Sequence, residues 1–167
     1  MYGGLGMKAK LSVEEAQDKA VKSMFRGNHC GPSTLKVLCQ SYNLDNEDFL
    51  WAGINFMGGI AMRQQAPCGA LSAAAIFFGL SHRCPMDDKE KAQKAIEKSR
   101  EQAARLVDLF NEKFGSITCR DVIGYDFTER EKNRELIESG KWKERCAGSV
   151  NFVIKKVYEM MEKDDNL

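Results

Sequence analysis

Apolar and small side chains recur every three or four positions through residues 87–114, with charged residues between them. This spacing places the apolar positions on one face of an α-helix. The same period runs through most of the chain, and short apolar runs such as residues 152–154 lie inside helical repeats. The sequence therefore predicts an all-α fold, a single-domain helical bundle of about five to seven helices.

Cap and turn patterns divide this periodicity into separate helices. Ser12 and Glu15 form a capping-box pair, which predicts a helix start at Ser12. The segment 57–61 (Met-Gly-Gly-Ile-Ala) predicts a flexible turn. The expected helices cover residues 12–26, 30–42, 45–56, 68–81, 87–114 and 146–161, and a short turn covers 118–123.

Residues 68–81 are strongly apolar and rich in alanine and glycine. Small side chains let neighbouring helices approach closely, so we expect this Ala/Gly-rich helix at the centre of the bundle. The uncharged stretch 64–81 has only about fifteen apolar residues, fewer than the roughly twenty that a membrane helix needs. We therefore expect no membrane span.

The chain has 167 residues and a formal net charge of +1, from 25 Lys and Arg against 24 Asp and Glu. This near-neutral charge argues against a nucleic-acid partner, which would favour a basic surface. We expect a flexible N-terminal segment over residues 1–10 and a single helical domain over 11–163. The first residues lack the apolar run of a secretion signal, so the expected location is cytoplasmic.

The chain contains six cysteines. In a reducing cytosol, cysteines favour metal binding or redox chemistry over disulfides. No CxxC pair is present, and no CxxCH motif, so we expect no c-type haem. Cys39 lies within an apolar helical stripe and is expected in the core, whereas Cys84 lies in a connector and is expected to be exposed or incidental.

The other four cysteines each fall at the expected start of a helix: Cys30, Cys68, Cys119 and Cys146. A helix N-terminus has free N–H groups and a partial positive charge, which stabilise a thiolate over a thiol. Thiolates bind soft metals and attack disulfides. The pattern alone leaves open whether the four are functional or are small core residues.

Around these cysteines the chain resembles the C_GCAxxG_C_C family, which is described as redox-active and has four shared cysteines. The resemblance covers residues 15–160, and it is carried by 53–60 (GINFMGGI), 68–73 (CGALSA) and 78–80 (FGL). Ala73 stands where the family signature has its last glycine, which questions the need for a glycine-only backbone angle there. The family cysteines correspond to Cys30, Cys68, Cys119 and Cys146, so Cys39 and Cys84 have no counterpart.

A related domain in split-Soret cytochromes is associated with an iron–sulfur site. The resemblance therefore implies that the four family cysteines ligate an iron–sulfur cluster of unspecified type, for electron transfer or redox sensing with a partner protein. Two alternatives stay open: metal-free thiol–disulfide chemistry, and a structural zinc site with four cysteines.

The two histidines support no separate chemistry. His29, next to Cys30, is expected to be a solvated helix-cap residue, or otherwise a base or a hydrogen-bond donor near the site. His82 ends the Ala/Gly-rich helix, where a cation interacts favourably with the helix dipole. The sequence leaves the oligomeric state open between a monomer and a homodimer, because the small residues of that helix could pack against a second copy.

Overall fold

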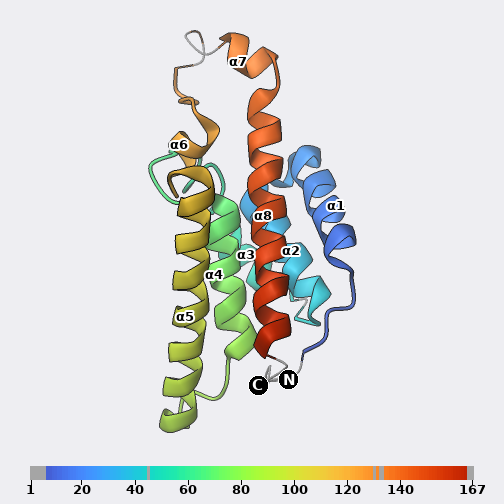
Figure 1. Cartoon of the computed structure of the whole chain (residues 1–167), viewed down its shortest axis with the longest axis vertical. Helices are drawn as coiled ribbons and strands as arrows, with labels where there is room; N and C mark the ends of the chain where they lie inside the picture. The colour runs from blue at the N-terminus through green and yellow to red at the C-terminus, as the bar shows by residue number, and fades with distance from the viewer. Residues whose placement is uncertain (1–6, 45, 130, 132–133, 165–167) are drawn as a thin grey trace.

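The computed structural model describes residues 7–44, 46–129, 131 and 134–164 (Figure 1). These residues form helices and connecting loops without a β-strand, which confirms the all-α prediction. Residues 1–6 of the expected N-terminal segment lie outside the described part. The C-terminal end of this expected segment contacts the bundle, because the Lys10 N–H donates to the Ser41 carbonyl over 2.8 Å.

Local capping and turn residues set the ends of several helices. The Ser12–Glu15 capping box is confirmed, with reciprocal hydrogen bonds of 3.1 and 2.8 Å. Asn46 and Asp88 cap the starts of α3 and α5, and Gly115 ends α5 in the left-handed conformation. The elements are α1 (Val13–Ser23), a π-helical turn η1 (Met24–Asn28), α2 (Cys30–Ser41), α3 (Glu47–Gly53), α4 (Gly69–His82), α5 (Lys89–Phe114), α6 (Cys119–Ile123), α7 (Arg134–Glu138) and α8 (Lys141–Asp164).

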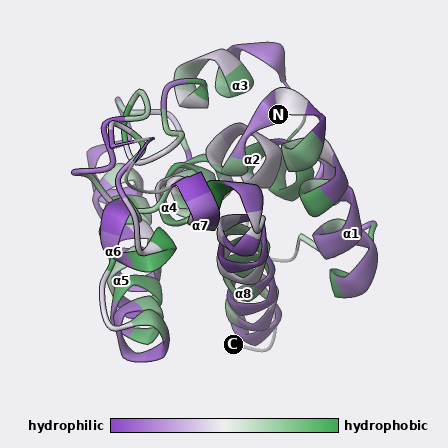
Figure 2. Cartoon of the chain, turned by 90° about the horizontal axis from the view of Figure 1, so that it is seen from above, coloured by the Kyte–Doolittle hydropathy of each residue, from purple (hydrophilic) through white to green (hydrophobic). Residues whose placement is uncertain are grey.

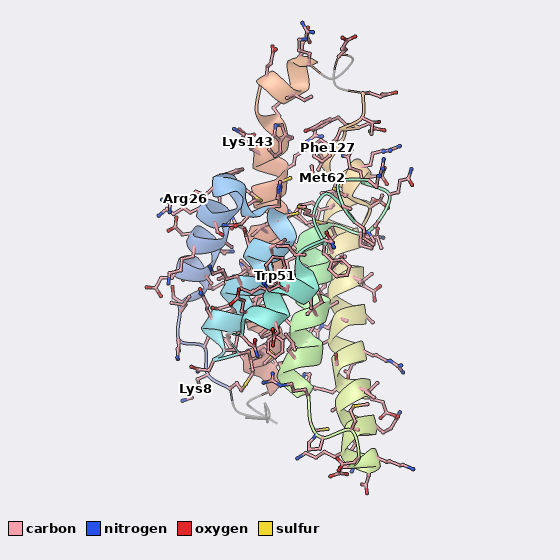
Figure 3. All side chains as sticks on the ribbon, turned by 180° about the vertical axis from the view of Figure 1, so that it is seen from behind. Lys8, Arg26, Trp51, Met62, Phe127 and Lys143 are labelled. Carbon is pink, nitrogen blue, oxygen red and sulfur yellow. The ribbon has the colours of Figure 1, made fainter. Side chains whose placement is uncertain are left out.

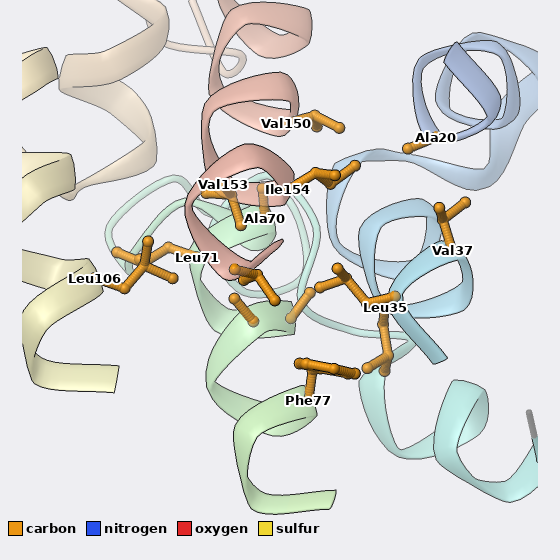
Figure 4. Close-up of a cluster of buried hydrophobic side chains, with 14 of the residues drawn as sticks. Ala20, Leu35, Val37, Ala70, Leu71, Phe77, Leu106, Val150, Val153 and Ile154 are labelled. Atoms are coloured by element: carbon orange, nitrogen blue, oxygen red, sulfur yellow. The ribbon is translucent and has the colours of Figure 1, made fainter. Parts of the chain in front are cut away.

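The main core surrounds α4, which packs against α2, α5 and α8 (Figure 4). Leu35 of α2, Phe77 of α4 and Ile154 of α8 are fully buried there. Burying a side chain of this size contributes about 1.5–3 kcal/mol. The central position predicted for the Ala/Gly-rich helix is confirmed, although α4 keeps Ala75 and Gly79 exposed.

Helix α8 runs between α5 on one side and α1 on the other (Figures 1 and 2). It begins at Lys141 rather than at residue 146 as predicted. The reason is Gly140, whose φ of 69° provides the turn between α7 and α8. None of the described helices combines the length and the apolarity that crossing a bilayer requires.

Candidate functional site

Cys30 and Cys68 are brought together by a close approach of two helix starts. Cys30 is the first residue of α2, and Cys68 is the N-cap of α4, as the sequence predicted. A Cβ atom on the following residue, Gly31 or Gly69, would overlap the backbone carbonyl oxygen of Phe56, and the one on Gly69 would also lie 2.9 Å from the Cys30 sulfur. The glycine of each Cys-Gly pair therefore permits the approach.

Cys119 is held beside Cys68 by backbone hydrogen bonds. The Cys68 N–H donates to the Ile117 carbonyl over 2.7 Å, and the Cys119 N–H donates to the Ala66 carbonyl over 3.0 Å. These bonds flank an isolated antiparallel β-bridge. Cys119 then begins α6, so its expected place at a helix start is confirmed.

The loop between α3 and α4 covers this end of the molecule. The sequence predicted a flexible turn at residues 57–61, but the loop is held by internal hydrogen bonds, including Met62 N–H to the Met57 carbonyl. The Gly59 N–H also donates a hydrogen bond to the Cys119 sulfur. Non-glycine residues in the left-handed region each cost about 1–3 kcal/mol, so the surrounding contacts must hold them. The left-handed residues of the loop are Gly58, Gly59, Ala61, Met62 and Gln64.

Gln64 joins this loop to the segment after α6. Its side chain is fully buried, donates from Nε2 to the Tyr125 carbonyl over 2.8 Å, and accepts at Oε1 from the Phe127 N–H over 2.5 Å. Its own carbonyl accepts from the Arg120 N–H over 3.1 Å. Sequence reasoning missed this residue, because a single glutamine in a polar run has no pattern that indicates burial.

Cys146 lies within a helix and not at a helix start, unlike the other three cysteines of the cavity. It is the sixth residue of α8, so the prediction of a helix start was wrong for this cysteine. The neighbouring Arg145 donates a hydrogen bond to the Ile123 carbonyl and so connects α8 to the end of α6. Cys146 packs against both the main core and a second, smaller cluster centred on Cys119, Ile123 and Tyr125.

All four cysteines line one cavity of about 560 Å³ at the end of the bundle where α6, α7 and the start of α8 lie. Met62, Phe127 and Lys143, which also line it, lie near one another in Figure 3. The exposed His29, the N-cap of α2, lines the cavity as well. The four sulfurs come from four separate segments. These are the first residue of α2 (Cys30), the N-cap of α4 (Cys68), the first residue of α6 (Cys119) and the second turn of α8 (Cys146).

The other candidate residues lie away from the cavity. Cys39 is fully buried in the main core, as predicted. Cys84, predicted to be exposed or incidental, is partly buried in the connector between α4 and α5. His82 makes a 2.7 Å hydrogen bond with Gln102 of α5.

The electrostatics of the cavity reverse the expectation of stable thiolates. Burial, and after it the negative charge of Cys30, raises the pKa of Cys119 and of Cys146 from 9.0 to about 12. The pKa of Cys68 is also raised, mainly by burial and then by the charge of Cys30, while the backbone N–H of Ala70 opposes the shift. Desolvation and like charges outweigh the helix-terminus effect. Several thiolates are therefore unfavourable here without a positive charge among them.

The arrangement limits the kind of metal group that fits. Within the described ranges, no group of three or more His, Cys, Asp or Glu side chains is arranged to hold one metal ion. A tetrahedral zinc ion with Zn–S bonds of about 2.3 Å would place its sulfurs about 3.8 Å apart. A cluster of several irons spaces its ligands more widely, and its usual donor set matches the described lining residues, which include four thiols and no carboxylate.

A model of a known protein family matches residues 28–160, a range that includes all four cavity cysteines, and its description is "Putative redox-active protein (C_GCAxxG_C_C)". The chain belongs to this family. No curated protein and no solved structure matches it.

The structure also accounts for the departure from the C_GCAxxG_C_C signature. Ala73 is buried within α4 and has no left-handed backbone angle. A methyl group is therefore tolerated where the family signature has its last glycine. Within residues 68–73, the glycine that the geometry requires is Gly69, directly after Cys68.

Proposed function

We propose that this redox-active protein holds an iron–sulfur cluster through Cys30, Cys68, Cys119 and Cys146, and uses it for electron transfer or redox sensing with a separate partner protein. The observation that carries the proposal is that these four cysteines, from four separate segments, line a single cavity. When bound, the cluster would supply reversible one-electron chemistry.

The surroundings of the sulfurs support a bound cation-containing group. The raised pKa values of Cys68, Cys119 and Cys146 mean that the cavity disfavours bare thiolates. Iron would provide the missing positive charge. The N–H group of Gly59 donates to the sulfur of Cys119, and such a bond raises the reduction potential of a thiolate-ligated cluster.

The same observations weaken the two alternatives. Metal-free thiol exchange needs a reactive thiolate, and raised thiol pKa values reduce the thiolate fraction at neutral pH. A single zinc ion needs a tight tetrahedron of sulfurs. We also propose a reducing, cytoplasmic location, because all six cysteines are free thiols.

The test is the iron, sulfide and zinc content of protein purified without oxygen, together with its visible spectrum. We expect iron and sulfide in equal amounts and a broad charge-transfer absorbance. Cys68→Ser should abolish both, whereas the matched control Cys39→Ser, at a core cysteine outside the cavity, should keep the absorbance in the folded fraction. A colourless protein that contains zinc, or that resists reconstitution with iron and sulfide, would refute the proposal.

A further inference from the structure

The cavity has a second wall, which is formed by apolar and aromatic side chains instead of thiols. Tyr125 and Phe127 pack edge to face with ring centroids 5.0 Å apart, and both belong to the smaller hydrophobic cluster rather than to the main core. Phe25 and Met62 contribute at the rim, where they are 46% and 36% exposed. The second wall consists of Val122, Ile123, Tyr125, Phe127, Ile137 and Trp142.

The cavity is larger than a cluster requires. A cube of four metals and four sulfides with bonds of about 2.3 Å and contact radii of about 1.8 Å fills at most about 200 Å³. The cavity measures about 560 Å³. This volume lies within the range of small-molecule sites, which are also mainly apolar with a few polar groups.

The charges around the cavity favour a neutral ligand. Among the described lining residues, the ionisable ones besides the cysteines and the Tyr125 phenol are His29 and Lys143, and both are exposed. An anionic group placed deeper would be desolvated without a partner. Aromatic side chains and methionine sulfur instead favour contact with a flat ring, and the imidazole and ammonium groups can donate to a carbonyl oxygen.

We propose that the part of this cavity lined by the aromatic residues binds a planar, uncharged aromatic diketone of the quinone class, adjacent to the four cysteines. A role of this site in electron transfer rests on the proposed function, the iron–sulfur cluster. The binding itself requires only the walls formed by this chain. A phosphate-bearing nucleotide fits less well, because Lys143 is the one lysine among the described residues that line the cavity.

Trp142 provides a direct reporter. It lines the cavity, whereas the other tryptophan, Trp51, is 66% exposed on α3 and does not. In the Trp51→Phe protein, Trp142 is the single tryptophan, and its emission can be excited apart from that of the tyrosines. The probe is 2,3-dimethyl-1,4-naphthoquinone, whose fully substituted quinone ring does not add thiols. We expect saturable quenching in protein purified without oxygen, both before and after iron and sulfide are removed.

Matched variants localise the binding. Phe25→Ala removes an exposed rim ring with little effect on folding, and we expect it to weaken quinone binding about tenfold. Ile60→Ala removes a side chain that is 48% exposed and does not line the cavity, so we expect unchanged binding. The hydrocarbon 2,3-dimethylnaphthalene should bind more weakly because it lacks carbonyl oxygens.

The outcomes separate the two proposals. Saturable quenching in a protein that takes up no iron and sulfide would support the quinone site and refute the cluster. Quenching that disappears when the cluster is present would refute the quinone site, because the cluster would then fill the cavity. Absence of quenching in both forms, equal binding by Phe25→Ala, or preferential binding of flavin mononucleotide would also refute it.

Discussion

The close approach of α2 and α4 gives a sharp test of how this site is built. Replacing Gly69 by alanine would place a methyl group onto the Phe56 carbonyl oxygen and 2.9 Å from the Cys30 sulfur. Backbone atoms cannot rotate away as a side chain can, so α4 or the loop must move. The same substitution at Gly79, also within α4, meets no atom within 4 Å.

The two substitutions should have opposite effects on stability. Overpacking of a well-packed site costs about 1–3 kcal/mol, so Gly69→Ala should lower the free energy of unfolding by that amount. In an exposed helix interior, alanine is favoured over glycine by about 0.5–1 kcal/mol, so Gly79→Ala should raise it. The variants should therefore differ by about 1.5–4 kcal/mol.

Urea denaturation of the metal-free proteins measures this difference. The midpoints should rank Gly79→Ala above the parent and the parent above Gly69→Ala, with similar slopes. Cluster reconstitution gives a second measurement, because a displaced α4 start moves Cys68 away from Cys30. If Gly69→Ala is as stable as Gly79→Ala and loads iron normally, the close approach does not build the site.

Three further predictions concern the same end of the bundle. Gln64→Leu removes the buried side-chain hydrogen bonds to the Tyr125 carbonyl and from the Phe127 N–H, so urea denaturation should show a loss of about 2–5 kcal/mol, and a loss below about 0.5 kcal/mol would contradict the importance of these bonds. In the metal-free protein, Cys119 and Cys146 have a pKa of about 12 when folded and 9.0 when unfolded. The unfolded chain therefore loses these protons first, so the free energy of unfolding should be constant up to about pH 9 and fall between pH 9 and 12, with a smaller fall in Cys146→Ser. Loading iron and sulfide at pH 8 should release protons from these thiols, measurable with an indicator in weak buffer, and Cys119→Ser should release fewer.

The sequence predicted what depends on local pattern. The capping box of Ser12, the long apolar stripe of α5 and the alanine-rich α4 are set by residues within a few positions of each other. The placement of Cys30, Cys68 and Cys119 at helix starts follows from the same kind of pattern. Local patterns thus predicted most of the fold and part of the site.

The rest depends on contacts between distant segments. Ala61 and Met62 have no intrinsic preference for left-handed angles, so their conformations follow from the loop bonds and not from residue type. The burial of Gln64 depends on Tyr125 and Phe127, some sixty positions away. The direction of the thiol pKa shifts depends on burial and on neighbouring charges, which a helix boundary alone does not reveal.

The wide separation of the four cysteines along the chain also has a consequence for folding. Metal centres with local ligand loops can begin to form on a nearly unfolded chain, but these cysteines meet only after α2, α4, α6 and α8 have packed. Insertion of a cluster would then be a late step and would cross-link three long chain segments at once. Such cross-links stabilise most by restricting the unfolded chain, so their loss would shorten the lifetime of the protein under proteolysis.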